Sequence, residues 1–426
     1  MRLSFVISAS CAVLALPAIA HAQDDSALAR SGLFARDRNA SVRQRPKPEY
    51  ANAPIGYGAF LISPTITTSV EGNDNIYATS SNTTSDVIFR LQPSVIAQTN
   101  WSRNLISVYG RASVNQYVDH GSESTIDFQV GGAGRLDVHS DLGFSGGASY
   151  EHDTEPRTSS GSPANIKEPI RYYVADVYGQ GTKQFNRLRL SGRVDFRDYN
   201  YESAVLTGGG FSNQDYRDHS VVTGGGKADY AISPDKSVFF TAIVNNRDFS
   251  TSIAGQPARS STGYEIAVGS NFDISHLVRG EVQVGYTEQN YDASVYSSVS
   301  GVSARGLVEY FPTELTTVTL TGSRSVEDSS ITGSSGYLST NISGQIDHEL
   351  LRNLILTGTV SDGNDDFKGI DRTDDRISVS AGGTYLLNRA VGLNVTFTHY
   401  TQDSSGKVAG PSFDVNRILG SLVFQF

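Results

Sequence analysis

The stretch FDVNRILGSLVFQF, residues 413–426, ends the chain and decides the fold. Every second residue counted back from the end is apolar or small, giving Phe426, Phe424, Leu422, Gly420 and Ile418. The residues between them form a mixed, partly polar set. Because successive side chains of a β-strand point to opposite faces, this stretch predicts a strand with one apolar face.

A strand that ends the chain on an aromatic residue resembles the C-terminal signal of bacterial outer-membrane barrels. The residues that carry this assembly signal are Leu422, Phe424 and Phe426. The resemblance implies the bacterial outer membrane as the compartment. It also implies contact with outer-membrane lipid, with lipopolysaccharide and with the barrel-assembly machinery.

The first 22 residues have the composition of a secretory signal peptide. Arg2 supplies a short basic region, and an apolar stretch runs from residue 3 to residue 16. Ala20 and Ala22 flank His21 and form a small-residue cleavage site. The alternative is an ordinary buried first helix. We expect a signal peptide over residues 1–22, because the apolar stretch is too short to span a membrane as a helix.

Composition narrows the class of the remaining 426 − 22 = 404 residues. The only cysteine is Cys11, so disulfides and thiolate chemistry are excluded from the mature chain. The chain has 42 Gly and 21 Tyr, and only 38% of its residues are hydrophobic. A membrane β-barrel needs apolar side chains only at alternate positions, so such a composition is compatible with one. The formal net charge of −10 argues against nucleic acid as a partner.

Residues 23–58 differ from the rest of the chain, because they are rich in Arg and Pro and lack a period of two. They predict a periplasmic N-terminal extension, with a short helix near residues 27–35. This extension could plug the lumen or contact a periplasmic partner. A mostly flexible leader is the alternative interpretation.

Residues 59–426 repeat one pattern, in which strands of about 10–16 residues are separated alternately by tight and wide connections. The tight connections centre on residues 101–104, 140–141, 185–187, 234–235, 275–276, 311–313, 351–353 and 388–389. The wide ones include residues 73–85, 154–169, 202–215, 250–260, 329–335 and 363–373. Short turns on one side and longer loops on the other are typical of outer-membrane barrels. The pattern predicts an all-β, antiparallel, up-and-down transmembrane barrel of about 18 strands with both termini in the periplasm.

The alternation is clearest between residues 188 and 197. Leu190, Val194 and Phe196 share one face, and Arg193 and Asp195 lie on the other. A soluble β-sandwich also alternates, but its strands are usually shorter and do not need charges opposite the apolar face in strand after strand. We therefore expect a barrel rather than a sandwich or a β-solenoid.

Two prolines fit this pattern less well, because a closed barrel pairs every backbone N–H. Pro64 and Pro93 fall inside the first two predicted strands. We expect them to mark bulges or the seam near the rim.

Many charged residues share the phase opposite to the apolar one, which predicts an aqueous lumen with mixed charges. They are Arg111, Asp127, Arg135, Asp137, Asp176, Arg189, Arg193, Asp195, Arg197, Lys227, Asp229, Glu265, Arg279, Glu281, Arg305, Glu309, Asp347, Arg376 and Arg417. Opposite charges on neighbouring strands can pair and brace the wall. A subset could instead filter a solute electrostatically.

Five tyrosines fall on the same inward phase, namely Tyr109, Tyr117, Tyr172, Tyr178 and Tyr199. Aromatic faces with polar edges can slide along sugar rings, so these are candidates for a saccharide track. Tyrosine is also the usual girdle residue of barrels, and a phase error of one residue would turn all five outward.

No pattern in the sequence indicates a catalytic site, a cofactor or a metal centre. Acidic residues gather at 362–366 and 371–375 without the spacing of an EF-hand loop, and a solvated loop explains them as well as Ca²⁺ binding does. The histidines are scattered, and no Gly-x-Ser-x-Gly is present. We expect a protein that is not an enzyme.

Specific residues between 45 and 105 carry a family resemblance. The runs RPKPEY (45–50), GAFLISP (58–64) and NDNIYAT (73–79), with LQPS (91–94) and NWSR (100–103), resemble the opening of the putative β-barrel porin 2 family. Members of this family look like outer-membrane barrels, often associated with capsule or exopolysaccharide production. The resemblance places Pro64 and Pro93 in the first hairpin of the barrel and implies no residue-level site.

The resemblance implies a channel for export of an exopolysaccharide or capsular polymer, with periplasmic export proteins as partners. Two alternatives stay open, namely a general diffusion porin and a structural or adhesive barrel plugged by its own N-terminal segment. A diffusion porin usually folds one long loop inward. The longest loops expected here, about 14–16 residues, count mildly against that design.

Overall fold

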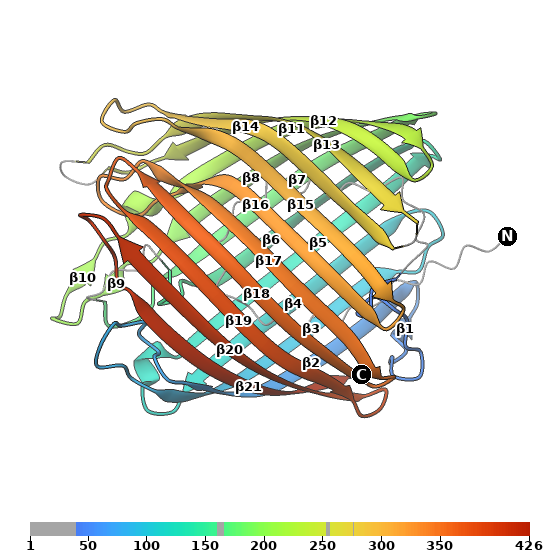
Figure 1. Ribbon diagram of the computed structural model, residues 1–426, viewed down its shortest axis with the longest axis horizontal. Helices are drawn as coiled ribbons and strands as arrows, with labels where there is room; N and C mark the ends of the chain where they lie inside the picture. The colour runs from blue at the N-terminus through green and yellow to red at the C-terminus, as the bar shows by residue number, and fades with distance from the viewer. Residues whose placement is uncertain (1–39, 160–165, 253–255, 276) are drawn as a thin grey trace.

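The computed structural model describes residues 40–159, 166–252, 256–275 and 277–426, and these form a closed β-barrel (Figure 1). The antiparallel sheet has 19 strands, of which the short β1 (Ile55–Tyr57) pairs only with β2, so 18 strands form the closed ring. The first half of the ring consists of β2 (Phe60–Asn73), β3 (Asp86–Thr99), β4 (Leu105–Tyr117), β5 (Thr125–His139), β6 (Leu142–Thr154), β7 (Arg171–Phe185), β8 (Leu188–Tyr201), β11 (His219–Ser233) and β12 (Lys236–Phe249). The second half consists of β13 (Ser261–Ile274), β14 (Val278–Tyr291), β15 (Val299–Thr313), β16 (Thr316–Asp328), β17 (Gly336–Leu351), β18 (Leu354–Lys368), β19 (Thr373–Leu386), β20 (Val391–Ser405) and β21 (Phe413–Gln425). The predicted fold class is confirmed.

The terminal strand closes the ring by pairing with the first long strand. The β2–β21 ladder runs from Thr65↔Gln425 to Asn73↔Arg417. On the N-terminal side of Thr65, β1 pairs with the edge of β2 that β21 pairs with further along, and Ile55 lies opposite Ile62. Closure satisfies backbone groups that an open edge would leave unpaired in lipid.

Both prolines lie inside the first hairpin of the ring. Ile66 faces Pro93 and Pro64 faces Val95 in the β2–β3 ladder, which continues through both positions without a register shift. The β3–β4 ladder, in contrast, has no pair between Leu91 and Ser94, where Pro93 cannot donate a hydrogen bond. The expectation of bulges was therefore wrong, because the ladder keeps its register around the missing donor. Pro64 does lie at the expected seam, where its carbonyl accepts a hydrogen bond from the amide of Phe426 at 3.2 Å.

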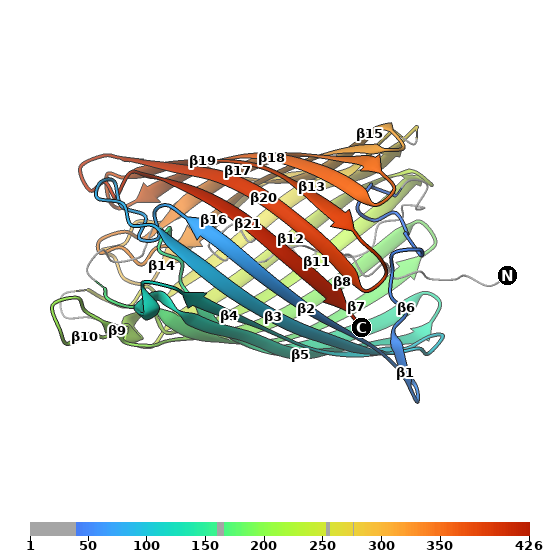
Figure 2. The same cartoon turned by 90° about the horizontal axis from the view of Figure 1, so that it is seen from below.

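The two ends of the barrel differ. Tight connections gather at one end, which we call the turn end, and the longer ones gather at the opposite loop end (Figure 1, Figure 2). Both β1 and the C-terminus lie at the turn end (Figure 2). No helix among the described residues has the length and apolar character that a membrane crossing requires.

One predicted loop was wrong, and another contains a hairpin of its own. The expected loop at 363–373 is mostly strand, because β18 continues to Lys368 and β19 begins at Thr373. Asp365 can stay in the ladder because it accepts hydrogen bonds from Arg376 and Ser339. The expected loop at 202–215 contains a small hairpin, β9 (Ala204–Val205) with β10 (Phe211–Ser212). The predicted signal peptide, with Ala20 and Ala22, and the short helix expected near 27–35 lie outside the described residues.

Candidate functional site: the lumen wall

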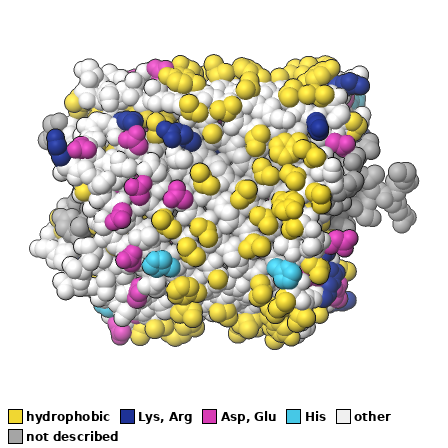
Figure 3. All heavy atoms as spheres, viewed as in Figure 1, with side chains coloured by type: hydrophobic (Ala, Val, Ile, Leu, Met, Phe, Trp, Pro, Cys, Tyr) yellow, Lys and Arg dark blue, Asp and Glu magenta, His cyan; other side chains and the backbone are white. Residues whose placement is uncertain are grey.

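Outer and inner faces of the wall can be told apart by the exposure of apolar side chains. In β8, Leu190, Val194 and Phe196 are exposed on one face, and Arg193 and Arg197 lie on the other. The outer surface carries a broad apolar band, with charged side chains toward the loop end and at the opposite rim (Figure 3). The charged face of each strand is therefore the inner one, which lines the lumen.

The structure places all the charged residues proposed for the lumen on this inner face. Most belong to ion pairs: Arg135–Asp137 at 3.4 Å, Arg193–Asp195 at 2.5 Å, Arg197–Asp176 at 2.7 Å, Lys227–Glu281 at 3.2 Å, Arg279–Glu309 at 2.5 Å, Arg305–Glu265 at 3.7 Å, and Arg376–Asp365 at 2.6 Å. Arg189 and Asp229 face each other in the β8–β11 ladder, and the hydroxyl of Thr154 donates a hydrogen bond to Asp127. These pairs brace the wall and cancel much of its charge.

Two of the lumen arginines differ from the rest. Among the residues that the structure describes, no carboxylate lies within ion-pair distance of Arg111 or Arg417. Arg111 is exposed, whereas Arg417 buries its Nε atom without a hydrogen-bond partner. Arg111 is therefore an uncompensated cation on the inner face of β4.

The five candidate tyrosines fall into two groups. Tyr172 stacks on Tyr201 at 5.0 Å, and Tyr199 stacks on His219 at 4.5 Å. These rings lie at the loop ends of their strands, where Tyr199 is only 7% exposed. Tyr117 is the last residue of β4 at the same end. Its side chain is partly buried, so it belongs to this group. The first group therefore packs under the loops rather than lining an open passage.

Tyr109 and Tyr178 form the second group and lie flat on the wall. A Cβ atom at Gly131 of β5 would be 2.6 Å from the hydroxyl oxygen of Tyr109. A Cβ atom at Gly147 of β6 would be 2.8 Å from Cε1 of Tyr178. Each ring thus rests on a neighbouring strand where the absence of a side chain makes room.

We call these two rings with their supporting glycines the tyrosine platform. Gly131 lies two residues from Ala133, which faces Gly147 across the β5–β6 ladder, so the two supports are about 8 Å apart. Arg193 stacks on the ring of Tyr178, with its guanidinium carbon 3.9 Å from the ring centre. The platform joins aromatic surface to polar groups on one stretch of the wall.

The aromatic row continues past β8 to residues that were not among the predicted ones. Phe249 of β12 stacks on His219 at 4.4 Å, which extends the row that starts at Tyr172 and Tyr201. Arg217 lies over the Tyr201 ring at 4.2 Å. Each aromatic residue stands at a strand end on the inward phase, and that shared position was the available signal.

The loops that follow these strand ends contact one another around the rim of the loop end. This loop collar consists of residues 74–85, 118–124, 155–159, 166–170, 202–218, 250–252, 256–260, 292–298, 329–335, 369–372 and 406–412. On one side, the linking contacts are Tyr77 with His120 (ring centres 5.8 Å apart), Arg157–Glu123 (2.6 Å), Arg217–Glu155 (2.8 Å) and Arg259 over Tyr216 (5.9 Å). On the other side they are Tyr296 to the Pro257 carbonyl (3.0 Å), Ser297 with Ser335 (3.3 Å), the Val408 amide to the Asp371 carbonyl (3.1 Å) and Asn75 to the Asp414 carbonyl (2.9 Å).

One ion pair bridges the inside of the barrel below the collar. Arg247 of β12 and Asp328 at the end of β16 are 2.5 Å apart, although three strands lie between them. Along the wall that separation is about 19 Å, so the pair spans the lumen side of β13–β15. It narrows the loop-end half of the lumen.

The chain that precedes β1 docks inside the turn end. Arg43 pairs with Asp347 of β17 at 2.8 Å, and Arg45 pairs with Glu349 at 3.3 Å. The amide of Val42, which is fully buried, donates to the Thr317 hydroxyl at 3.0 Å. Basic residues of this segment therefore meet acidic residues at the turn end of β17.

Two further contacts hold the outer part of the segment. Lys47 lies 3.5 Å from Glu349, and Glu49 lies 2.5 Å from Arg352 in the β17–β18 turn. Burial lowers the pKa of Lys47, although Glu349 acts in the opposite direction. Hydrogen bonds from its own backbone amide and from Arg352 lower the pKa of Glu49. We call residues 41–49 the docked segment.

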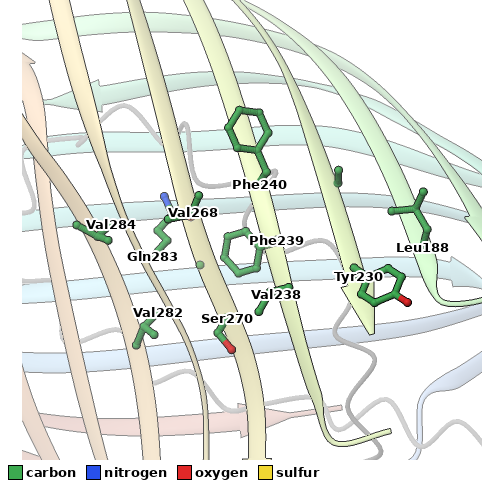
Figure 4. Close-up of a pocket in the computed structure, with 12 residues that line it drawn as sticks. Leu188, Tyr230, Val238, Phe239, Phe240, Val268, Ser270, Val282, Gln283 and Val284 are labelled. Atoms are coloured by element: carbon green, nitrogen blue, oxygen red, sulfur yellow. The ribbon is translucent and has the colours of Figure 1, made fainter. Parts of the chain in front are cut away.

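A depression of about 690 Å³ on the wall is not part of the lumen. Val238, Phe240, Val268, Val282 and Val284, which belong to the outward phase of β12–β14, line it (Figure 4). It opens on the apolar outer surface, so it is not a candidate solute site. Nor does any group of His, Cys, Asp and Glu among the described residues suit a metal ion.

A comparison with protein families agrees with this architecture. The family model described as Putative beta-barrel porin 2 matches residues 47–426. A comparison with curated proteins finds no match.

Solved outer-membrane proteins share a general likeness. OccK2 (OpdF) of Pseudomonas aeruginosa is 11% identical with a TM-score of 0.47, covering 86% of this chain and 98% of that chain. A mutant of the ferric enterobactin receptor PfeA from the same organism is 9% identical with a TM-score of 0.46, covering 89% and 81%. The siderophore receptor PirA of Acinetobacter baumannii is 8% identical with a TM-score of 0.45, covering 85% and 80%.

The family match covers the docked segment from residue 47, β1 and the whole ring of strands, and it confirms the resemblance found in the first hairpin. The protein is an outer-membrane β-barrel of the porin-like class, and the chain belongs to the family described as Putative beta-barrel porin 2.

Proposed function

We propose that this barrel is an outer-membrane channel that exports a saccharide polymer, such as an exopolysaccharide or a capsular polymer. The observation that carries the proposal is the tyrosine platform, because Tyr109 and Tyr178 lie flat on the inner wall. Flat aromatic faces contact the apolar faces of sugar rings, and adjacent polar groups bind their hydroxyls. A surface of this kind holds a polymer weakly and allows it to slide.

The paired charges of the wall support a hydrated lumen. In the ion pairs Arg197–Asp176 and Arg279–Glu309, each positive charge is neutralised by a carboxylate. A neutral, hydroxyl-rich solute therefore meets a wall that is polar but carries little net charge. An 18-strand barrel is wide enough for an aqueous passage.

In the proposed orientation the turn end faces the periplasm and the loop end faces the outside. Short periplasmic turns and longer external loops are the usual asymmetry of such barrels. The docked segment would then approach from the periplasm, where export proteins could contact it. Leu422, Phe424 and Phe426 would be presented to the assembly machinery from the same side.

The position of the docked segment is compatible with an open path. It binds β17, through Asp347 and Glu349, and β17 stands nine positions from β6 in the ring of 18. β6 carries Gly147, which supports the platform. The segment and the platform thus occupy opposite sides of the lumen.

Two other functions are compatible with parts of this geometry. A general diffusion porin would use the compensated lumen without the platform. A structural barrel with no open pore would use the Arg247–Asp328 bridge and the loop collar as a closure.

Two measurements test the proposal together. The full chain is reconstituted in planar bilayers to measure conductance and its block by oligosaccharides, and the gene is deleted to quantify extracellular polysaccharide. We expect conductance with saccharide block and a loss of exported polymer. Normal polymer export in the deletion strain would contradict the export function, and conductance without saccharide block would favour a general porin. A complete lack of conductance would favour the structural barrel.

A further inference from the structure

We infer that the channel selects an acidic saccharide, and that Arg111 beside the tyrosine platform recognises its carboxylate. This inference rests on the proposed saccharide channel and names the class of sugar. It follows from Arg111, an exposed cation beside the platform that has no carboxylate partner among residues 40–159, 166–252, 256–275 and 277–426.

Arg111 and Tyr109 are neighbours on the inner face of β4. They are two residues apart, so both side chains point into the lumen, about 7 Å apart at their bases. Tyr109 leans away from Arg111 toward β5, where it lies on Gly131. The aromatic face and the guanidinium are thus presented side by side.

The other arginines near the platform are already paired. Arg135 of β5, two residues from Ala133, lies 3.4 Å from Asp137. Arg193 stacks on Tyr178, and its guanidinium is 2.5 Å from Asp195, which it contacts through both Nε and Nη2. In contrast, no carboxylate lies within 4 Å of Arg111 in the part of the chain that the structure describes. The charge available to a ligand at the platform is therefore that of Arg111.

The nearest acids on this part of the wall are held by other groups. Asp127, two residues from Gln129 on β5, accepts hydrogen bonds from the hydroxyls of Thr154 and Thr125. Glu151 lies one strand further, on β6. Gln129 faces Arg111 in the β4–β5 ladder and faces Glu151 in the β5–β6 ladder, so it lies between the two charges. Its side-chain amide donates to Glu151, and the hydroxyl of Ser149 lies 3.4 Å from the same carboxylate. Glu151 is thus directed toward Gln129 and Ser149 rather than toward Arg111.

An arginine suits a carboxylate because its planar guanidinium donates two parallel hydrogen bonds. A neutral sugar offers the same ring face to Tyr109 but no anion to Arg111. The site therefore favours sugars that carry a carboxylate, such as uronic acids. A phosphate group also accepts two hydrogen bonds from a guanidinium, so a phosphate-bearing sugar shares this recognition, and the feature that Arg111 selects is the anion.

The test uses single-channel block of the full chain in planar bilayers by an oligogalacturonate and by a neutral maltooligosaccharide of equal length. We expect the acidic probe to bind the wild-type channel about tenfold more tightly than the neutral one. Arg111→Gln should remove this preference. Arg111→Lys should retain part of it, because lysine keeps the positive charge but cannot donate two parallel hydrogen bonds from a planar group.

Arg389→Gln is the matched control, since Arg389 is exposed in the β19–β20 turn and the substitution removes the same charge far from the platform. It should leave the preference unchanged.

The outcomes separate this inference from the proposed function. Equal block by both probes, or an acidic preference that survives Arg111→Gln, would overturn the role of Arg111 and leave a saccharide channel standing. A channel that neither probe blocks would overturn both the acidic preference and the saccharide channel. The heat-modifiable electrophoretic mobility of each variant establishes that the barrel has folded.

Discussion

The ring of Tyr109 lies across Gly131 of the neighbouring strand, so closely that a Cβ atom there would meet the phenolic oxygen at 2.6 Å. The backbone carbonyl of Ala148 lies 3.0 Å from the same position. A side chain at 131 therefore cannot coexist with the present position of the ring. The tyrosine platform depends on this glycine as much as on the tyrosine.

Gly131→Ala should displace the Tyr109 ring from the wall without changing its chemistry. We expect oligosaccharides to bind the channel about fivefold more weakly, which corresponds to ~1 kcal/mol. Single-channel block measures the change. Gly134→Ala on the same strand is the matched control, because the nearest atom to its Cβ would be 3.8 Å away. Equal affinities in both variants would show that the ring does not contact the sugar.

Glu349→Gln should loosen the docked segment. Arg45 and Lys47 both contact this carboxylate, whose side chain is only 4% exposed, so the substitution leaves two cations with a neutral partner. Because Arg45 and Lys47 precede prolines, trypsin cuts the docked segment at the Arg43–Gln44 bond. We expect this cleavage to accelerate about tenfold, equivalent to ~1.4 kcal/mol in the opening equilibrium.

Glu314→Gln removes the same charge at the same rim and serves as the control. Arg45 donates a hydrogen bond to the backbone carbonyl of Glu314, and the substitution retains that carbonyl. Cleavage rates that rise equally in both variants would mean that the Glu349 ion pairs do not hold the segment.

Acid should release the outer part of the docked segment. The pKa of Glu49 is lowered from 4.5 by its own backbone amide and by Arg352. A carboxyl group with a lowered pKa stabilises docking above its undocked pKa, and this stabilisation is lost as pH falls through the docked value. A spin label at Ala51→Cys should therefore become more mobile as pH falls below about 4.5.

Glu49→Gln removes the titrating group, so its label should show no such transition. A transition of unchanged size in that variant would assign the acid response to other residues.

Arg217→Gln should weaken the loop collar while leaving the barrel closed. Its side chain pairs with Glu155 at 2.8 Å and lies over Tyr201, and both ends of the ion pair are largely buried. Removing one partner of a buried pair costs about 3–5 kcal/mol. Proteolysis of residues 202–218 from outside should therefore accelerate strongly, with unchanged heat-modifiable mobility.

A double-mutant cycle with Glu155→Gln isolates the pair. If the two substitutions prove additive in their effect on cleavage, the ion pair is not what ties these loops together.

The period of two explains how much could be predicted from the sequence. Counting from Phe426 assigned Leu190 and Arg193 to opposite faces, and closure of β21 on β2 followed from the need to pair both edges. Ion-pair partners within the wall were harder to predict. Lys227 reaches Glu281 three strands away, which depends on the curvature of the wall and not on pairing between neighbours.

The contacts of the loop collar and of the tyrosine platform could not be predicted from the sequence. Arg217 and Glu155 are 62 residues apart in sequence, and only the assembled loops bring them together. The contact of Tyr109 with Gly131 depends on the β4–β5 register, which the alternation alone does not determine. The alternation predicted that Tyr109 and Tyr199 share a face, but not that one lies on the open wall and the other under the loops.

The most direct test of the saccharide channel is the current through single molecules of the full chain in a planar bilayer, recorded before and after an oligosaccharide is added. We expect stepwise conductance that the sugar interrupts in brief, concentration-dependent blocks, with shorter blocks in Gly131→Ala. A stable open current that no saccharide interrupts, or no current at all, would contradict it.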